Sequence, residues 1–134
     1  MQFKELSGDL AFEFFVPGVA AGTAIEWPQF VMPWNATITS ITWVPGANVT
    51  ANGTNYATIS VRNRSTNGSG SVVPASRVYS ATNSTAQVAE ALTLSSTATD
   101  LQPSANDVLT ISVAHSGTGL TIPAGLVQVA LRLR

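Results

Sequence analysis

Short runs in which apolar and polar residues alternate are the feature of this sequence that most restricts its fold. The clearest run covers residues 56–64, where Ala57, Ile59 and Val61 alternate with polar neighbours. A second run covers residues 107–115 and a third covers 126–133. A period of two places the apolar residues of a strand on one face of a sheet, so each run predicts a half-buried β-strand.

Weaker patterns predict further strands over residues 12–16, 24–27, 36–44, 77–79 and 88–94. Within the third of these, Ile38 and Ile41 are out of phase, and a β-bulge near Ser40 would restore the register. Within the last, the alternation places Glu90 on the apolar face or at its edge, so a short helical turn is the alternative there.

Turn-forming residues separate these runs, and they predict loops at residues 44–48, 52–53, 67–71, 103–107 and 123–125. Helix-forming stretches are nearly absent. A set of about eight short strands in a chain of 134 residues is typical of a two-sheet fold. We therefore expect an all-β protein, a jelly-roll-like antiparallel β-sandwich over residues 24–134.

The first 23 residues differ from the rest. They contain four of the five phenylalanines, Phe3, Phe12, Phe14 and Phe15, followed by a stretch of small residues over 18–23. Apolar segments rarely stay exposed on soluble monomers. We therefore expect residues 1–23 to form an N-terminal arm that contacts a neighbouring subunit, and the alternative is an ordinary first core strand followed by a loop.

The composition excludes several classes of protein. There is no cysteine, so disulfides and thiolate metal sites are impossible. The six basic residues are scattered and indicate no nucleic-acid surface. No apolar run reaches the ~18 residues of a membrane span, and no signal peptide is recognisable at the start, which predicts synthesis in a cytoplasm.

Charged residues make up 10% of the chain, against about 25% in an ordinary soluble domain. This composition fits a surface kept soluble by Ser and Thr, and it equally fits a surface that other subunits cover.

Residues for catalysis, metal binding or cofactor binding are missing from the sequence. His115 is the single histidine, and no serine-nucleophile motif or phosphate-binding loop accompanies it. Asn106 and Asp107 with Asp100 could bind calcium weakly, but turn formation by Asn-Asp explains them better. We therefore expect a protein that is not an enzyme and has no cofactor.

Two other patterns have both a functional and a structural interpretation. Six of the eight asparagines precede x-Ser/Thr, yet Ser and Thr are so abundant that we interpret these asparagines as turn and strand-edge residues rather than glycosylation sites. Trp27, Trp34 and Trp43 could form a sugar-binding platform, but packing in the core or between subunits is favoured.

Several stretches resemble small β-sandwich decoration proteins of tailed bacteriophages. They are PWNATITSITWVP (33–45), NYATISVRNR (55–64), ALTLS (91–95), DVLT (107–110) and GLTIPAGLV (119–127). The resemblance covers residues 30–134 and implies a trimeric sandwich on the outside of an icosahedral head. It implies a virion protein whose partners are the major capsid protein and two further copies of itself.

With the arm, this gives a set of residues that we expect to contact other subunits or the capsid: Phe3, Phe12, Phe14, Phe15, Trp27, Phe30 and Trp34. The alternative function is a head-fibre or tail-associated module that recognises a glycan on the host surface. A glycan binder should expose several aromatic side chains on one face, whereas a decoration (cement) protein should bury them in its core or between subunits.

Overall fold

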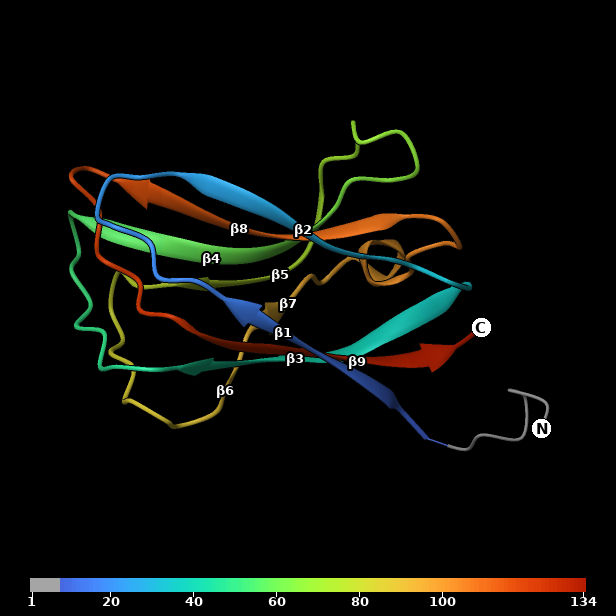
Figure 1. Ribbon diagram of the computed structural model, residues 1–134, viewed down its shortest axis with the longest axis horizontal. Helices are drawn as coiled ribbons and strands as arrows, with labels where there is room; N and C mark the ends of the chain where they lie inside the picture. Colours follow the sequence, from blue (N-terminus) through green and yellow to red (C-terminus); the bar gives the residue numbers. More distant parts are fainter. Residues whose placement is uncertain (1–7) are drawn as a thin grey trace.

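The computed structural model describes residues 8–134, which fold into two antiparallel β-sheets packed face to face (Figure 1). The β1 sheet has the order β1-β9-β3-β6, with strands Leu10–Val16 (β1), Gly125–Leu133 (β9), Ala36–Pro45 (β3) and Glu90–Ala91 (β6). The β2 sheet has the order β2-β8-β4-β5-β7, with strands Ile25–Val31 (β2), Val108–Ser116 (β8), Tyr56–Asn63 (β4), Val72–Val78 (β5) and Thr93–Leu94 (β7). The helical segment Ala98–Leu101 is a single 3₁₀ turn. No helix in the described part of the chain is long and apolar enough to cross a membrane.

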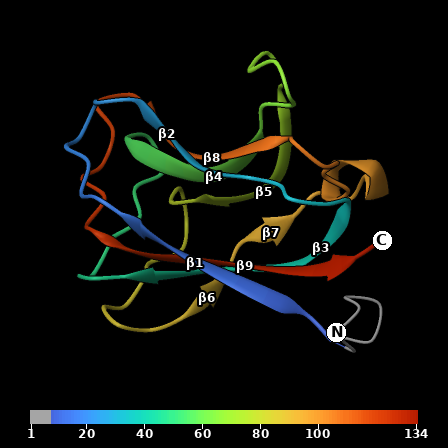
Figure 2. The same cartoon turned by 45° about the vertical axis from the view of Figure 1, so that its right-hand side comes forward.

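The strand connections are those of a jelly roll, as the sequence predicts. The first strand pairs with the last (β1 with β9), β2 pairs with β8, β3 with β6, and β4 with β5, all antiparallel. The chain is thus a long double ribbon that folds over into two layers. Figure 2 shows β1, β9 and β3 in one layer and β2, β8 and β4 in the other.

The core lies between the sheets and is built from the inward-facing residue of each alternating pair. Along β4, Ala57, Ile59 and Val61 are at most 1% exposed. On the facing sheet, Val127 and Val129 of β9 are equally buried. The alternation that predicts the strands therefore also selects the core residues, because successive side chains of a strand point to opposite faces.

The predicted bulge in β3 is present. The pairing of β3 with β9 shifts register between Ile38 and Ser40, and as a result Ile38 and Ile41 are both 1% exposed. The extra residue turns the two out-of-phase isoleucines to the same face.

The predicted strand over residues 88–94 is instead two short strands in different sheets. β6 pairs with β3 in one sheet and β7 pairs with β5 in the other. Leu92 lies between them, 3% exposed, and its backbone N–H donates to the carbonyl oxygen of Ile41 at 2.9 Å. The chain crosses from one sheet to the other at this point, which interrupts the alternation seen in the sequence.

Residues 10–23 belong to the sandwich. They do not form the separate arm over residues 1–23 that we expected beside a sandwich over residues 24–134. β1 pairs with β9 at all seven of its positions, from Leu10 to Val16. Val16 and Val19 are 0% and 4% exposed in the core, and Val19 forms a bridge with Ile122. The adjacent Phe14 and Phe15 mask the period of two, which is why the strand resembles an apolar arm in the sequence. Residues 1–7 lie outside the described part of the chain.

A buried polar network joins the two sheets at their β5–β6 side. The indole Nε1 of Trp43, a side chain that is 0% exposed, donates to the hydroxyl of Tyr79 at 2.9 Å. That hydroxyl in turn donates to Glu90 Oε1 at 3.0 Å, and the Ser84 hydroxyl donates to the Tyr79 oxygen at 2.9 Å. Arg77 pairs with Glu90 at 3.3 Å and lies over the Tyr79 ring. Glu90 is thus on the apolar face of its segment because these donors satisfy its carboxylate.

Replacing Tyr79 with phenylalanine should cost about 1–3 kcal/mol in the free energy of unfolding, because the buried Trp43 donor loses its acceptor. Tyr56→Phe is the matched control, since the Tyr56 hydroxyl forms no hydrogen bond within the described residues, and it should change stability by less than about 0.5 kcal/mol. Urea unfolding of the two variants measures the difference, and equal losses would contradict this role for the network.

Candidate interaction surface

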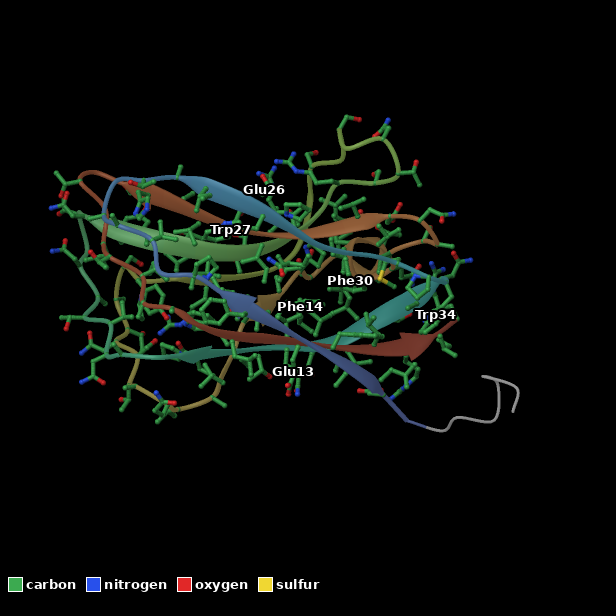
Figure 3. All side chains as sticks on the ribbon, viewed as in Figure 1. Glu13, Phe14, Glu26, Trp27, Phe30 and Trp34 are labelled. Atoms are coloured by element: carbon green, nitrogen blue, oxygen red, sulfur yellow. The ribbon has the colours of Figure 1, made fainter. Side chains whose placement is uncertain are left out.

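The aromatic residues expected to contact other subunits collect where the edge strands β1 and β2 lie side by side. Phe12 and Phe14 point inward from β1, and both stack on Phe30 of β2. The ring centroids are 5.4 Å apart for Phe12 and 5.0 Å for Phe14, with interplanar angles of 23° and 14°. Figure 3 shows Phe14 and Phe30 between the two sheets. Stacked rings at this spacing close the open side of the sandwich.

The tryptophans do not share one exposed platform. Trp43 is 0% exposed, whereas Trp27 and Trp34 are partly buried and pack against the core. Trp27 lies opposite Ile111 on the inward face of β2. The indole ring that would complete a three-tryptophan sugar site is therefore inside the protein.

Phe15 is the residue of the predicted set that points outward. Its side chain is 68% exposed on the outer face of the β1 sheet. The register places it opposite Leu126, and Leu126 opposite Val44, so these three residues form an apolar row across β1, β9 and β3. Glu13, two positions away on the same face, points away from the sandwich (Figure 3). Phe3 lies outside the described residues.

The two long edge strands differ in how they are protected against pairing with another chain. β2 carries Pro28, and its register with β8 shifts between Pro28 and Phe30, so its edge is irregular. β1 has neither a proline, a lysine nor a register shift along Leu10–Val16. Proline, lysine and bulges are the usual means of protecting an edge. The one charged side chain within Leu10–Val16 is Glu13, so the β1 edge is more regular than the β2 edge, and it borders the apolar row.

Charged groups gather on the outer face of the β2 sheet. Glu26 of β2 accepts hydrogen bonds from Arg64 Nε at 2.7 Å, from Arg64 Nη2 and from the Thr110 hydroxyl. Arg62 Nη1 lies 3.6 Å from the same carboxylate. Hydrogen bonding from Arg64 is the main cause that holds the pKa of the Glu26 carboxyl below its usual value. On the other sheet, a hydrogen bond from Thr39 and the pairing with Arg132 lower the pKa of Asp9.

The residues considered for catalysis or metal binding have structural partners. His115 Nε2 lies 2.9 Å from the carbonyl oxygen of Thr23. Asp107 accepts from Asn63 Nδ2 at 2.7 Å and from the backbone N–H of Ser104 at 2.9 Å. Asp100 accepts from the Ser95 hydroxyl at 2.6 Å. Across residues 8–134 there is no group of three or more side chains that could hold a metal ion.

The six sequon asparagines also act locally. Each of five uses its Oδ1 to accept one or more backbone N–H groups in a loop, and these are Asn35, Asn48, Asn52, Asn67 and Asn83. Asn63 is 8% exposed, accepts from the backbone N–H of Ser65 and donates to Asp107. These asparagines are abundant because the long loops need side chains that form hydrogen bonds with backbone groups.

Comparisons with known proteins give little further information. No family model matches the chain, and no curated protein matches it. A solved chain from the structure of infectious bursal disease virus Gx strain is similar over 92% of this chain, with 10% sequence identity and a TM-score of 0.39. This chain spans about a third (32%) of that chain's length. A likeness at this TM-score establishes neither a shared fold nor a shared function.

Adjacent phenylalanines in β1 should respond differently to substitution. Phe14→Thr keeps β-propensity but removes a stacked ring, and should cost about 2–4 kcal/mol in the free energy of unfolding. Phe15→Thr should cost less than about 0.5 kcal/mol, because that ring lies in solvent. Chemical denaturation of both variants tests the assignment, and a larger loss for Phe15 would show that the inward and outward faces of β1 are reversed.

Glu26→Gln should destabilise the protein by about 1 kcal/mol near neutral pH, a value reduced from that of a buried charged pair because the site is partly exposed. The folded-state pKa of Glu26 is lowered, so its contribution is complete above its unfolded value of about 4.5 and is lost as pH falls below it. The difference between wild type and variant should therefore shrink from about pH 7 to about pH 3. A difference that stays constant over this range in urea titrations would contradict the assignment.

Proposed function

We propose that this protein is a structural virion protein, a decoration (cement) protein that binds the outside of an assembled bacteriophage capsid and stabilises it. The observation that supports this most directly is the exposed Phe15, which continues into an apolar row with the partly buried Leu126 and Val44 at the β1 edge of the sheet. A large exposed apolar side chain at the edge of an open sheet indicates a surface that another subunit covers.

The rest of the molecule is compatible with a structural role. A two-sheet sandwich with a continuous core and a buried polar network suits a structural role. The titratable residues that could serve catalysis are engaged in local hydrogen bonds instead. A protein that binds the assembled lattice, and not its separate subunits, stabilises that lattice by mass action.

The partners that we propose are the major capsid protein and two further copies of this chain. A homotrimer has the closed symmetry of a three-fold lattice position. We place the capsid contact on the apolar row, because Phe12, Phe14 and Phe30 are already occupied within the subunit. A capsid reconstruction with isolated single copies would overturn the trimer.

The alternative, a head-fibre or tail module that binds a host glycan, has weaker support. Sugar-binding surfaces use exposed aromatic faces, whereas here Trp43 is buried and Trp27 faces the core. A glycan array probed with the full chain distinguishes the two functions.

The capsid contact can be tested with Phe15→Asp and undecorated heads assembled from the major capsid protein of the same phage. Losing the burial of one Phe, about 1.5–3 kcal/mol, should lower the affinity by about tenfold or more. Val78→Asp is the matched control, because Val78 is 40% exposed on the opposite sheet. Co-sedimentation with heads measures both variants. Unchanged binding of Phe15→Asp, or equal loss in the control, would contradict the proposed contact.

A further inference from the structure

Arg62 differs from every other arginine of this chain in how its guanidinium is used. Each of the other four donates at least two hydrogen bonds within the protein, and these are Arg64, Arg77, Arg132 and Arg134. Arg62 donates none within the described residues: its closest ionic partner is Glu26 at 3.6 Å, and its Nε atom is buried without a partner. Arg62 thus has one ionic partner and keeps N–H donors that no group in the described part of the chain accepts.

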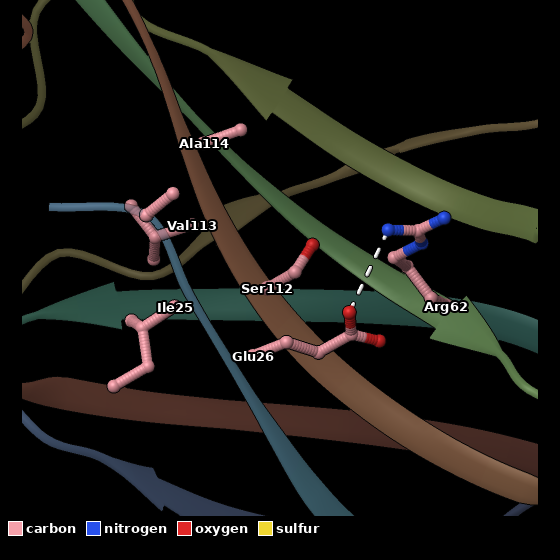
Figure 4. Close-up of a pocket in the computed structure, with 7 residues that line it drawn as sticks. Ile25, Glu26, Arg62, Ser112, Val113 and Ala114 are labelled. Carbon is pink, nitrogen blue, oxygen red and sulfur yellow. Dashed lines mark ion pairs between the residues drawn. The ribbon is translucent and has the colours of Figure 1, made fainter. Parts of the chain in front are cut away.

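Arg62 stands at the rim of a hollow on the outer face of the β2 sheet (Figure 4). The hollow has a volume of about 280 Å³ and is open to solvent. Its remaining lining comes from β2 and β8 and the residue before β2: Ala24, Ile25, Glu26, Ser112, Val113 and Ala114. This volume lies just below the range of about 300–1,000 Å³ for small-molecule sites, so the hollow suits a single side chain.

The charges around the hollow leave one positive charge uncompensated. Arg64 forms a two-bonded pair with Glu26 and, with Thr110, satisfies that carboxylate. Arg62 then adds a second cation beside a glutamate that already has a partner. Its side chain is 28% exposed, its Nη1 atom faces Glu26, and neither Nη atom donates a hydrogen bond within the described residues, so the guanidinium can donate to an incoming group.

The geometry favours a carboxylate with an apolar neighbour. An arginine presents two parallel N–H groups that match the two oxygens of a carboxylate. Ser112 lies between Arg62 and the Ile25–Glu26 segment in Figure 4 and offers a hydroxyl donor. The rest of the lining on this face is small and aliphatic, with Ala24 and Ala114 both exposed, and it has no aromatic ring on which a sugar could stack.

We propose that this hollow binds the carboxylate of an acidic side chain of a partner protein, held by Arg62 and Ser112, with an adjacent apolar residue of that partner against Ala24 and Ala114. The site lies on the sheet opposite the apolar row, so this inference does not depend on the capsid contact proposed above.

Nuclear magnetic resonance titration of the full ¹⁵N-labelled chain tests the proposal. The probe is the blocked dipeptide N-acetyl-Leu-Glu-N-methylamide, and its matched control is the Leu-Gln peptide, which has the same shape without the charge. We expect saturable shifts of the backbone amides of Glu26, Arg62 and Ser112, with a dissociation constant on the order of millimolar. The glutamine peptide should bind at least about tenfold more weakly.

Three variants separate a specific site from general attraction to a basic protein. Arg62→Gln should lose binding of the glutamate peptide, Arg62→Lys should bind at an intermediate level, and Arg132→Gln, which removes the same charge from the other sheet, should bind like wild type. The dispersion of each spectrum reports whether the variant is folded, and Arg62→Lys keeps the test valid if Arg62→Gln does not fold.

Three results would overturn the proposal. They are equal binding of the two peptides, undiminished binding by a folded Arg62 variant, and glucuronate binding as tightly as the glutamate peptide, which would indicate an acidic sugar instead of a protein partner.

Discussion

The pairing of β9 on both of its edges is the interaction on which the rest of the structure depends. The last strand of the chain pairs with β1 at seven positions and with β3 at nine. It thereby joins the beginning, the first third and the end of the sequence in one sheet, and its inward valines meet the other sheet across the core. Because β9 occupies the interior of the sheet, β1 is left at the margin, where Phe15 on its outer face has a neighbouring strand on one side only.

The two open sides of the sandwich are closed by different kinds of interaction. At the β1–β2 side, stacked phenylalanine rings fill the gap between edge strands. At the β5–β6 side, a hydrogen-bonded network with one carboxylate does so, and burial raises the pKa of the Tyr79 hydroxyl within it. The side closed by apolar rings can pack against a further apolar surface. The side closed by the polar network already has its polar groups bonded to one another. The β1–β2 side is accordingly the side on which we place interactions with other subunits.

Much of the fold could be predicted from the sequence, because a strand with one buried face records its orientation in its own alternation. The strands around Ile59, Ile111 and Val129 were identified in this way, and so was the bulge near Ser40. The prediction was wrong where the local sequence pattern of a segment does not reveal its position in the tertiary structure. A strand was predicted over residues 12–16, but the adjacent Phe14 and Phe15 obscured its alternation, so the segment was assigned to an arm instead of the sandwich. The change of sheet at Leu92, between β6 and β7, was not predicted. The hollow at Arg62 had no signal in the sequence, since its residues come from strands far apart in the chain.

The sequence by itself determined the class of fold, the absence of disulfides and the identity of most inward-facing residues, because alternation and composition act locally. Only the tertiary structure decided which strands became edges, that Glu90 would be satisfied by Tyr79 and Arg77, and that Arg62 would lie beside a glutamate already paired with Arg64. It also decided that residue 125 must be glycine, since a Cβ there would lie 2.5 Å from the ring of Trp43. These outcomes depend on which segments, distant in the sequence, become neighbours in space. The packing of the whole core decides which strands pair, and no single segment contains that information.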